Sequence, residues 1–252
     1  MNVFITGASS GIGAALARRY ASEGATLGLF ARREQALDEV AQSLDATRVA
    51  TYVGDVADAT RAADAACDFL ARFGPADIVI ANAGISRGAD TSLAEDLPVF
   101  RDILETNVLG LVHTFHPFIA SMRAARRGTL VGIASIAGFR GLPGAGAYSS
   151  SKAAAINYLE SLRIELARDG VTVVTICPGY IATAMTAGNP YRMPFLMQAD
   201  RAATLIARAI SRRRRWYVLP WQMAVVGAIL RAMPRPLLDA LLERAPRKPR
   251  AP

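Results

Sequence analysis

With 252 residues, 52% of them hydrophobic, the chain is long and apolar enough to bury a large core, and we expect a single domain. Its formal net charge of +8 comes from the C-terminal part, since residues 201–252 hold twelve basic and two acidic side chains, whereas residues 1–200 hold 17 and 19. A slightly acidic body argues against nucleic acid as the partner.

Residue 1 leads directly into an apolar strand and a glycine-rich turn, which leaves no room for a cleavable signal peptide. The two cysteines, Cys67 and Cys177, lie far apart, and each is in an apolar stretch that predicts a buried thiol. They form neither a disulfide framework nor a CxxC zinc motif. We therefore expect a cytoplasmic protein in a reducing compartment.

Short apolar runs alternate along the chain with longer segments of helical period. The runs rich in β-branched residues predict strands at 3–6, 26–30, 49–53, 78–81, 129–133, 171–177 and 216–219. The segments between them predict helices at 12–22, 34–44, 59–73, 98–124, 147–168 and 201–211. Apolar strands separated by helices are typical of a parallel sheet covered on both faces. The prediction is an α/β fold with a Rossmann-like, doubly wound sheet of about seven parallel strands.

A glycine-rich turn, Thr-Gly-Ala-Ser-Ser-Gly-Ile-Gly, follows the first predicted strand. Gly7 permits a tight turn, Gly11 lets the backbone approach a pyrophosphate, and Gly13 lets the helix pack closely on the strand. The N-terminus of that helix offers free N–H groups and the positive end of its dipole. The residues predicted to hold a dinucleotide here are Gly7, Ser9, Ser10, Gly11, Ile12 and Gly13.

The end of the second strand indicates which dinucleotide is bound. An NAD enzyme carries a carboxylate there for the ribose 2'-hydroxyl, but this chain has Ala31 followed by Arg32 and Arg33. A guanidinium such as that of Arg32 can hold a 2'-phosphate through a forked contact, which favours NADP(H). The alternative, that both arginines only solvate a helix start, is weakened because cations are unfavourable at that end of a helix.

The Gly-x-x-x-Gly-x-Gly spacing of this turn resembles the short-chain dehydrogenase/reductase family, and the resemblance continues to about Pro220. Its further marks, in chain order, are Asp55-Val56, Asn82-Ala83-Gly84, Asn107, Ser135, Tyr148-x-x-x-Lys152, and Pro178-Gly179 with Thr183. The resemblance implies an oxidoreductase that interconverts a carbonyl and an alcohol with a nicotinamide cofactor. It also implies a homodimer or homotetramer, paired through the helices that carry Asn107 and Tyr148.

Three of these groups are cofactor residues by resemblance. Asp55 is expected to accept a hydrogen bond from the adenine amino group, with Val56 packed beside it. The backbone of Asn82, Ala83 and Gly84 is expected to lie under the adenosine ribose, although Asn-Ala-Gly is also an ordinary strand-ending turn. The loop residues expected at the nicotinamide amide and the pyrophosphate are Pro178, Gly179, Ile181 and Thr183.

Reduction of a ketone needs a proton donor as well as a hydride. Tyr148 and Lys152 are four residues apart in a predicted helix and so share one face, where the ammonium would lower the pKa of the phenol. The resemblance makes Tyr148 the general acid/base, Lys152 its modulator and a ribose ligand, and Ser135 the residue that orients the carbonyl. Asn107, unfavourable inside a helix, is expected to loosen that helix and support a proton relay. The alternative is an NADP(H)-binding sensor or scaffold without turnover.

The apolar stretch 185–198, which includes Tyr191, stands where family members carry a substrate lid. It indicates an apolar carbonyl or alcohol substrate, unless these residues, like Phe139 and Leu142, pack against the core instead. His113 and His116 have no carboxylate or thiol neighbours that would complete a ligand set, so we expect no metal.

Residues 221–252 extend beyond the predicted oxidoreductase domain 1–220 as a basic, amphipathic helical segment. Its two apolar runs, 223–230 and 237–242, are too short to span a bilayer. The extension is expected to close over the pocket or to form a subunit interface. It could instead rest on an anionic membrane surface; nucleic acid is the weakest alternative, because few aromatic residues are interleaved with the basic ones.

Overall fold

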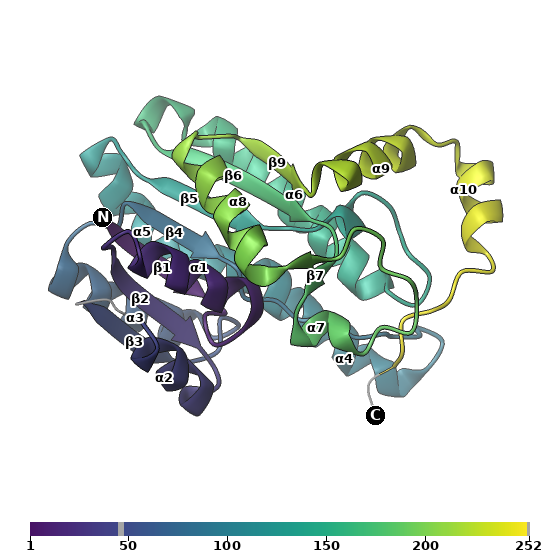
Figure 1. Cartoon of the computed structure of the whole chain (residues 1–252), viewed down its shortest axis with the longest axis horizontal. Helices are drawn as coiled ribbons and strands as arrows, with labels where there is room; N and C mark the ends of the chain where they lie inside the picture. The colour runs from purple at the N-terminus through teal and green to yellow at the C-terminus, as the bar shows by residue number, and fades with distance from the viewer. Residues whose placement is uncertain (45–47, 251–252) are drawn as a thin grey trace.

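The computed structural model describes residues 1–44 and 48–250, so the last two residues of the extension lie outside it. Seven parallel strands form the main sheet in the order β3-β2-β1-β4-β5-β6-β9 (Figure 1). Their bounds are β1 Asn2–Thr6, β2 Thr26–Ala31, β3 Val49–Val53, β4 Ile78–Ala81, β5 Thr129–Ile133, β6 Thr172–Pro178 and β9 Trp216–Leu219. The predicted Rossmann-like α/β fold is confirmed.

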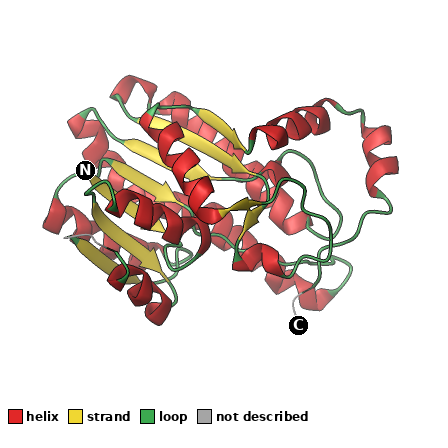
Figure 2. Cartoon of the chain, viewed as in Figure 1, coloured by secondary structure: helices red, strands yellow, loops and turns green. Residues whose placement is uncertain are grey.

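Helices cover both faces of this sheet (Figure 2). One core layer joins the sheet to α1, α2 and α8 through side chains such as Leu16, Leu37 and Ile206. The other joins it to α3, α5 and α6 through side chains such as Phe69 and Phe118. The bounds of these helices are α1 Gly11–Ala21, α2 Glu34–Gln42, α3 Ala59–Phe73, α5 Gly110–Ala125, α6 Gly146–Glu165 and α8 Ala199–Ser211. The strands are buried from both sides, which explains their continuous apolar sequence.

The predicted helix 98–124 is divided in the structure. It consists of α4 (Leu97–Leu104), a π-helical turn η2 (Glu105–Leu109) and α5. Asn107 lies at the centre of the π turn and bonds outside its own helix, to Ile85 and Ser151. A π turn inside an α-helix often marks a functional position. The loosening expected at this asparagine is therefore present.

Several short elements are absent from the sequence prediction, because elements of two to four residues show no periodicity. They are the pair β7 (Ile181–Ala182) and β8 (Met197–Gln198), the helix α7 (Ala184–Ala187), and the 3-10 turns η1 (Ala94–Asp96), η3 (Ile136–Gly138) and η4 (Ala167–Asp169). One expectation about the cysteines is wrong. Cys177 is buried in β6, but Cys67 is exposed because it lies on the outer face of α3.

Beyond the last strand, the two apolar runs of the extension form α9 (Trp221–Ala232) and α10 (Arg235–Leu242). Met223 of α9 is buried close to Gly179. Arg140 donates hydrogen bonds to the carbonyls of Leu230, Arg231 and Met233, at 2.7 to 2.9 Å, and so caps the C-terminal end of α9. Of the helices in the described part of the chain, none has the length and hydropathy needed to cross a bilayer.

Gly28, in the middle of β2, tests how tightly the core packs. A Cβ atom there would lie 2.5 Å from Phe69 and 2.6 Å from Phe4, so Gly28→Ala must displace both rings. We expect a loss of about 1–3 kcal/mol in the free energy of unfolding, the usual cost of overpacking. Gly188→Ala is the control, because no heavy atom of the described residues lies within 4 Å of its Cβ position. Urea unfolding that gives equal midpoints for the two variants would contradict this packing.

Candidate active site

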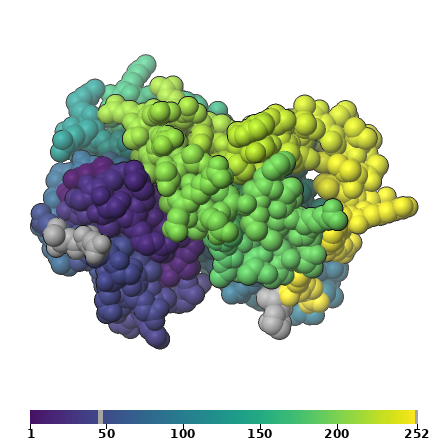
Figure 3. Space-filling view, in the orientation of Figure 1, coloured from purple at the N-terminus to yellow at the C-terminus, as the bar shows by residue number. Residues whose placement is uncertain are grey.

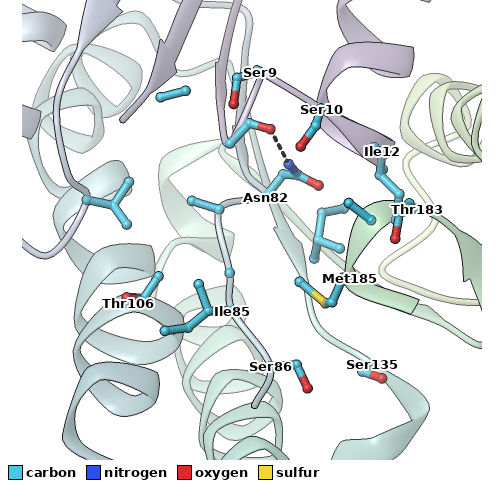
Figure 4. A pocket seen from close by; sticks show the side chains of 18 of the residues that line it. Ser9, Ser10, Ile12, Asn82, Ile85, Ser86, Thr106, Ser135, Thr183 and Met185 are labelled. Carbon is cyan, nitrogen blue, oxygen red and sulfur yellow. Dashed lines mark hydrogen bonds between the residues drawn. The ribbon is translucent and has the colours of Figure 1, made fainter. Parts of the chain in front are cut away.

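A cleft of about 490 Å³ opens at the carboxyl ends of the strands, where the strand order reverses between β1 and β4. Figure 4 shows side chains from several elements facing this space. The residues predicted from the sequence that line it are Gly7, Ser9, Ser10, Gly11, Ile12, Arg32, Asp55, Val56, Asn82, Ala83, Gly84, Ser135, Tyr148, Lys152, Pro178, Gly179, Ile181 and Thr183. Gly13 and Asn107 do not line it; both are buried behind its wall.

The backbone of the glycine-rich turn packs closely against the residues behind it, and this leaves space for a ligand in front of it. A Cβ at Gly13 would lie 2.3 Å from the carbonyl oxygen of Gly7, so the first helix can approach the strand only if this residue is glycine. The Asn82 side chain donates to the carbonyls of Thr6 and Gly7, at 3.0 and 3.2 Å, which fixes the turn. In the described part of the chain, the Ser10 side chain makes no cap at the start of α1, and the first turn of this helix holds no acidic residue. The free backbone N–H groups in the first turn of α1 are therefore available to bind an anion.

Two arginines from the end of β2 stand beside this turn. Arg32 pairs with Asp55, with 3.1 Å between Nη1 and Oδ2. Arg33 donates from Nη2 to the hydroxyls of Ser10 and Ser9, at 2.8 and 3.2 Å. Both guanidinium groups line the cleft, so Arg33 joins Arg32 as a candidate phosphate ligand. The sequence predicts that role for Arg32 alone, although Arg33 carries the same charge.

Asn107 supports the cleft from behind. Its Oδ1 accepts from the backbone N–H of Ile85 at 2.8 Å, and its Nδ2 donates to the Ile85 carbonyl and to Ser151 Oγ, each at 2.9 Å. Gly84 separates this amide from Lys152, since a Cβ at Gly84 would lie 3.1 Å from Asn107 Oδ1 and 3.5 Å from Lys152 Nζ. The asparagine therefore fixes the loop beside the lysine.

Tyr148 and Lys152, both on α6, face the cleft together with Ser135 at the end of β5. Lys152 is 5% exposed, and its Nζ donates to the Ile133 carbonyl at 2.8 Å. The same Nζ lies 5.8 Å from the centroid of the Tyr148 ring. The Ser135 hydroxyl accepts from the Ala137 N–H at 3.1 Å, which orients it. The Tyr148 phenol, the Lys152 ammonium and the Ser135 hydroxyl thus lie together in one part of the cleft.

Burial controls the protonation of these groups. It raises the pKa of the Tyr148 phenol above its ordinary value, and the nearby Ser135 hydroxyl lowers that pKa only in part. Burial also lowers the pKa of Lys152 to about 8. The sequence predicts that the ammonium lowers the pKa of the phenol, but in the chain itself the pKa of Tyr148 is raised, and desolvation is the largest cause. At neutral pH the phenol is therefore protonated and the amine is charged.

Some lining residues were missed from the sequence, including Ser86 and Thr106, whereas Met185 of the predicted lid also lines the cleft. Met185 belongs to the stretch expected to form a substrate lid, so that stretch does reach the cleft. Phe139 does not line the cleft; its ring stacks on Trp216, with 5.7 Å between the centroids, and packs against α9 at Gly227.

Neither histidine was expected to bind a metal. His113 Nδ1 lies 2.9 Å from the Val56 carbonyl, and His116 is exposed. Residues 1–44 and 48–250 contain no group of three or more His, Cys, Asp or Glu side chains placed to hold a metal ion.

Comparison with known proteins agrees with this geometry. The sequence model of the family described as short chain dehydrogenase matches residues 1–192. The chain is 41% identical over 247 residues, or 95% of each chain, to an uncharacterized oxidoreductase of Myxococcus xanthus. The chain belongs to the short-chain dehydrogenase/reductase family.

Solved structures of this family share the fold. A short chain dehydrogenase/reductase from Burkholderia phymatum in complex with NAD superposes with a TM-score of 0.81 at 26% identity, over 100% of this chain and 98% of that one. An alcohol dehydrogenase from Thermococcus sibiricus complexed with 5-hydroxy-NADP gives 0.75 at 29% identity, over 86% and 94%. Short-chain dehydrogenases are oxidoreductases that use NAD or NADP and act on small molecules.

Lys152 provides a test of this electrostatic environment that needs no ligand. We expect its amine to titrate with a midpoint near pH 8, because burial disfavours the ammonium. The measurement is an NMR titration of the protein labelled with 13C-lysine, and it is simple because the chain has only two lysines, Lys152 and Lys248. The variant Lys248→Met assigns the two signals. A midpoint for Lys152 near 10.4, the ordinary value, would show that the amine is not desolvated.

Proposed function

We propose that the chain is an NADP(H)-dependent oxidoreductase that reduces the carbonyl group of a small, largely apolar substrate to an alcohol, or runs the reverse reaction. One observation carries this proposal. A single cleft holds a glycine-rich turn with two arginines at one end, and Tyr148, Lys152 and Ser135 at the other. A dinucleotide extends between such ends, with its phosphates at the glycine turn.

The residues present fit this cofactor. The free N–H groups of α1 and the glycine backbone would hold the pyrophosphate, while Arg32 and Arg33 would hold the 2'-phosphate. Gly11 leaves room next to Thr183, whose Cγ2 atom would lie 3.0 Å from a Cβ at that glycine. Pro178, Gly179 and Ile181 would line the nicotinamide end. When bound, NADPH supplies the hydride that reduces the carbonyl carbon.

The side chains supply the proton. Tyr148 keeps its proton at neutral pH, so its hydroxyl donates that proton to the carbonyl oxygen as the alcohol forms. The Ser135 hydroxyl donates a hydrogen bond to the same oxygen and so orients the carbonyl. The Lys152 ammonium, 5.8 Å from the ring centroid, stabilises the phenolate that Tyr148 becomes. Asn107 maintains the loop next to this ammonium and supports the return of a proton to Tyr148.

In the free chain, burial keeps the Tyr148 phenol in the protonated form that reduction needs. Alcohol oxidation requires a phenolate as base, and burial disfavours the charged form of Tyr148. The substrate side of the cleft has an apolar part made by Ile85 and Met185. Tyr191 raises the pKa of Tyr148, which supports a position of the predicted lid beside the reacting groups. These contacts support a substrate that is apolar over much of its surface.

Tyr148→Phe tests the assignment of the proton donor. We expect turnover to fall by about 100-fold or more, with NADPH affinity nearly unchanged, because only the hydroxyl is removed. Tyr158→Phe is the matched control, since it makes the same change on the same helix within the core layer of α3 and α5. Turnover is followed as NADPH oxidation with a panel of aldehydes, ketones, quinones and 3-oxoacyl thioesters.

Two results of that assay would count against the assignment. Comparable turnover by the Tyr148→Phe variant would mean that another group donates the proton. Tight NADPH binding by the wild-type protein without turnover of any compound would favour the sensor or scaffold raised as the alternative.

Arg32→Leu tests the choice of cofactor. We expect NADPH affinity to fall at least about tenfold, the scale of one lost charge-assisted contact, and NADH affinity to stay the same. Arg33→Leu, like Arg32→Leu, should lower the affinity for NADPH. Arg208→Leu, exposed on α8 near the amino ends of the strands, removes the same charge far from the cleft and should change neither affinity. Titration of cofactor fluorescence measures all three variants, and equal losses for NADH and NADPH would contradict the role of Arg32.

A further inference from the structure

The end of the chain returns to the cleft after α10. In Figure 1 it passes back beside α4, and in Figure 3 the same residues, in yellow, follow one end of the molecule beside the green residues around α7. The N–H of Gly88 donates to the Pro249 carbonyl at 3.0 Å, and Gly88 forms a β-bridge with Arg250. On the other side, a Cβ at Gly144 would lie 2.9 Å from Cβ of Arg247. Residues 247–250 therefore join the loop after β4 to the loop before α6, and both loops flank Tyr148.

Arg250 anchors this segment. Its Nε atom lies 2.7 Å from Oδ2 of Asp96, a carboxylate that is 6% exposed, and its Nη2 lies 3.1 Å from Oε1 of Glu95. A partly buried, multiply bonded pair of this kind is stronger than an exposed salt bridge. The segment is thus attached by charge as well as by backbone pairing.

This attachment places Lys248 at the reacting groups. Its Nζ donates to Ser86 Oγ at 2.8 Å, and Ser86 lines the cleft together with Ser135 (Figure 4). The same Nζ lies 5.9 Å from the centroid of the Tyr148 ring, which is nearly the distance of Lys152. The chain has 29 basic residues but only two lysines, and both bring their ammonium to this one phenol.

Lys248 lacks a counter-ion within the described residues, where its only hydrogen-bond partner is the neutral Ser86 hydroxyl. The carboxylates that face this segment interact with arginines, since Asp96 and Glu95 bind Arg250 and Asp90 faces Arg247 and Arg250. Burial lowers the pKa of Lys248, which indicates that its ammonium is held partly out of water without compensation. Such a charge is costly unless an anion joins it.

We propose that Lys248 binds an acidic group of the substrate, so that the substrate class is a carbonyl compound with a carboxylate near its carbonyl and an apolar remainder. This inference rests on the proposed function. The cofactor phosphates belong at the glycine turn, at the other end of the cleft, so we assign the anion that meets Lys248 to the substrate. One ammonium and one hydroxyl suit a single carboxylate better than a phosphate, which usually collects several donors. The C-terminal segment is then a substrate-binding wall.

The test compares each acid with its neutral ester. The compounds are 2-oxooctanoate and 4-oxodecanoate, each with its methyl ester, and the quantity is the ratio of kcat/KM for acid and ester. We expect Lys248→Met to lower this ratio at least about tenfold, because the ester forms no ion pair. Lys248→Arg keeps the cation and should retain most of the preference. Arg235→Met, exposed on α10, removes the same charge away from the cleft and should leave the ratio unchanged.

The outcomes separate the two proposals. If wild-type protein reduces the esters as well as or better than the acids, or if Lys248→Met leaves the ratio unchanged, the role of Lys248 is wrong while the proposed function stands. If wild-type protein reduces none of these compounds and nothing in the wider carbonyl panel, the proposed function is wrong. In that case, calorimetry of decanoate binding to the protein, with and without NADPH, tests whether Lys248 binds a carboxylate. Binding lost in Lys248→Met and kept in Arg235→Met supports the site, and equal binding contradicts it.

Discussion

All seven strands of the main sheet run in the same direction, and this constraint brings their carboxyl ends to one edge. The glycine turn after β1, the arginines after β2, Asn82 after β4 and Ser135 after β5 are distant in sequence but line one cleft. The reversal of strand order between β1 and β4 opens the space between them. The proposed chemistry of the site depends on this convergence, because no single segment contains both the phosphate-binding turn and the proton donor.

Burial shifts the pKa values of Tyr148 and Lys152, and so sets their protonation states. Desolvation favours neutral forms, so it strengthens the hold of Tyr148 on its proton and weakens that of Lys152. The two effects act in opposite directions on two neighbouring groups, and they leave a neutral donor beside a charged amine at neutral pH. This arrangement suits delivery of a proton to a carbonyl oxygen. The C-terminal segment adds a second ammonium, Lys248, to the same phenol.

The fold could be predicted from the sequence because its strands are short apolar runs whose signal is local. All seven predicted strands agree with the structure to within one residue at each end, and four of them, β3, β4, β5 and β9, have the predicted bounds. The helix 98–124 was predicted as one piece, since the bond that opens its π turn joins Asn107 to Ile85, 22 residues away. Cys67 was misplaced because an apolar neighbourhood does not show which face of an amphipathic helix a residue occupies.

The candidate site was predictable where a motif has a fixed place after a strand. Most residues chosen this way line the cleft, and Gly13 and Asn107 stand behind it as packing and loop-positioning residues. The position of Phe139 depended on α9, and that of Lys248 depended on Arg250 reaching Asp96, 154 residues away. Contacts of that range leave no pattern in the local sequence. The protonation of Tyr148 was also unpredictable, because the balance between desolvation and the ammonium depends on the finished cleft.

The most direct measurement of the central claim, that burial keeps the Tyr148 phenol protonated, is an ultraviolet difference titration of the cofactor-free protein. Subtracting the phenolate absorbance of Tyr148→Phe from that of the wild-type chain isolates this residue among seven tyrosines. We predict no phenolate signal from Tyr148 below about pH 10, the ordinary tyrosine pKa. A signal that develops between about pH 7 and 8 would show that the neighbouring ammonium, and not burial, sets the protonation of the phenol, and would contradict the account.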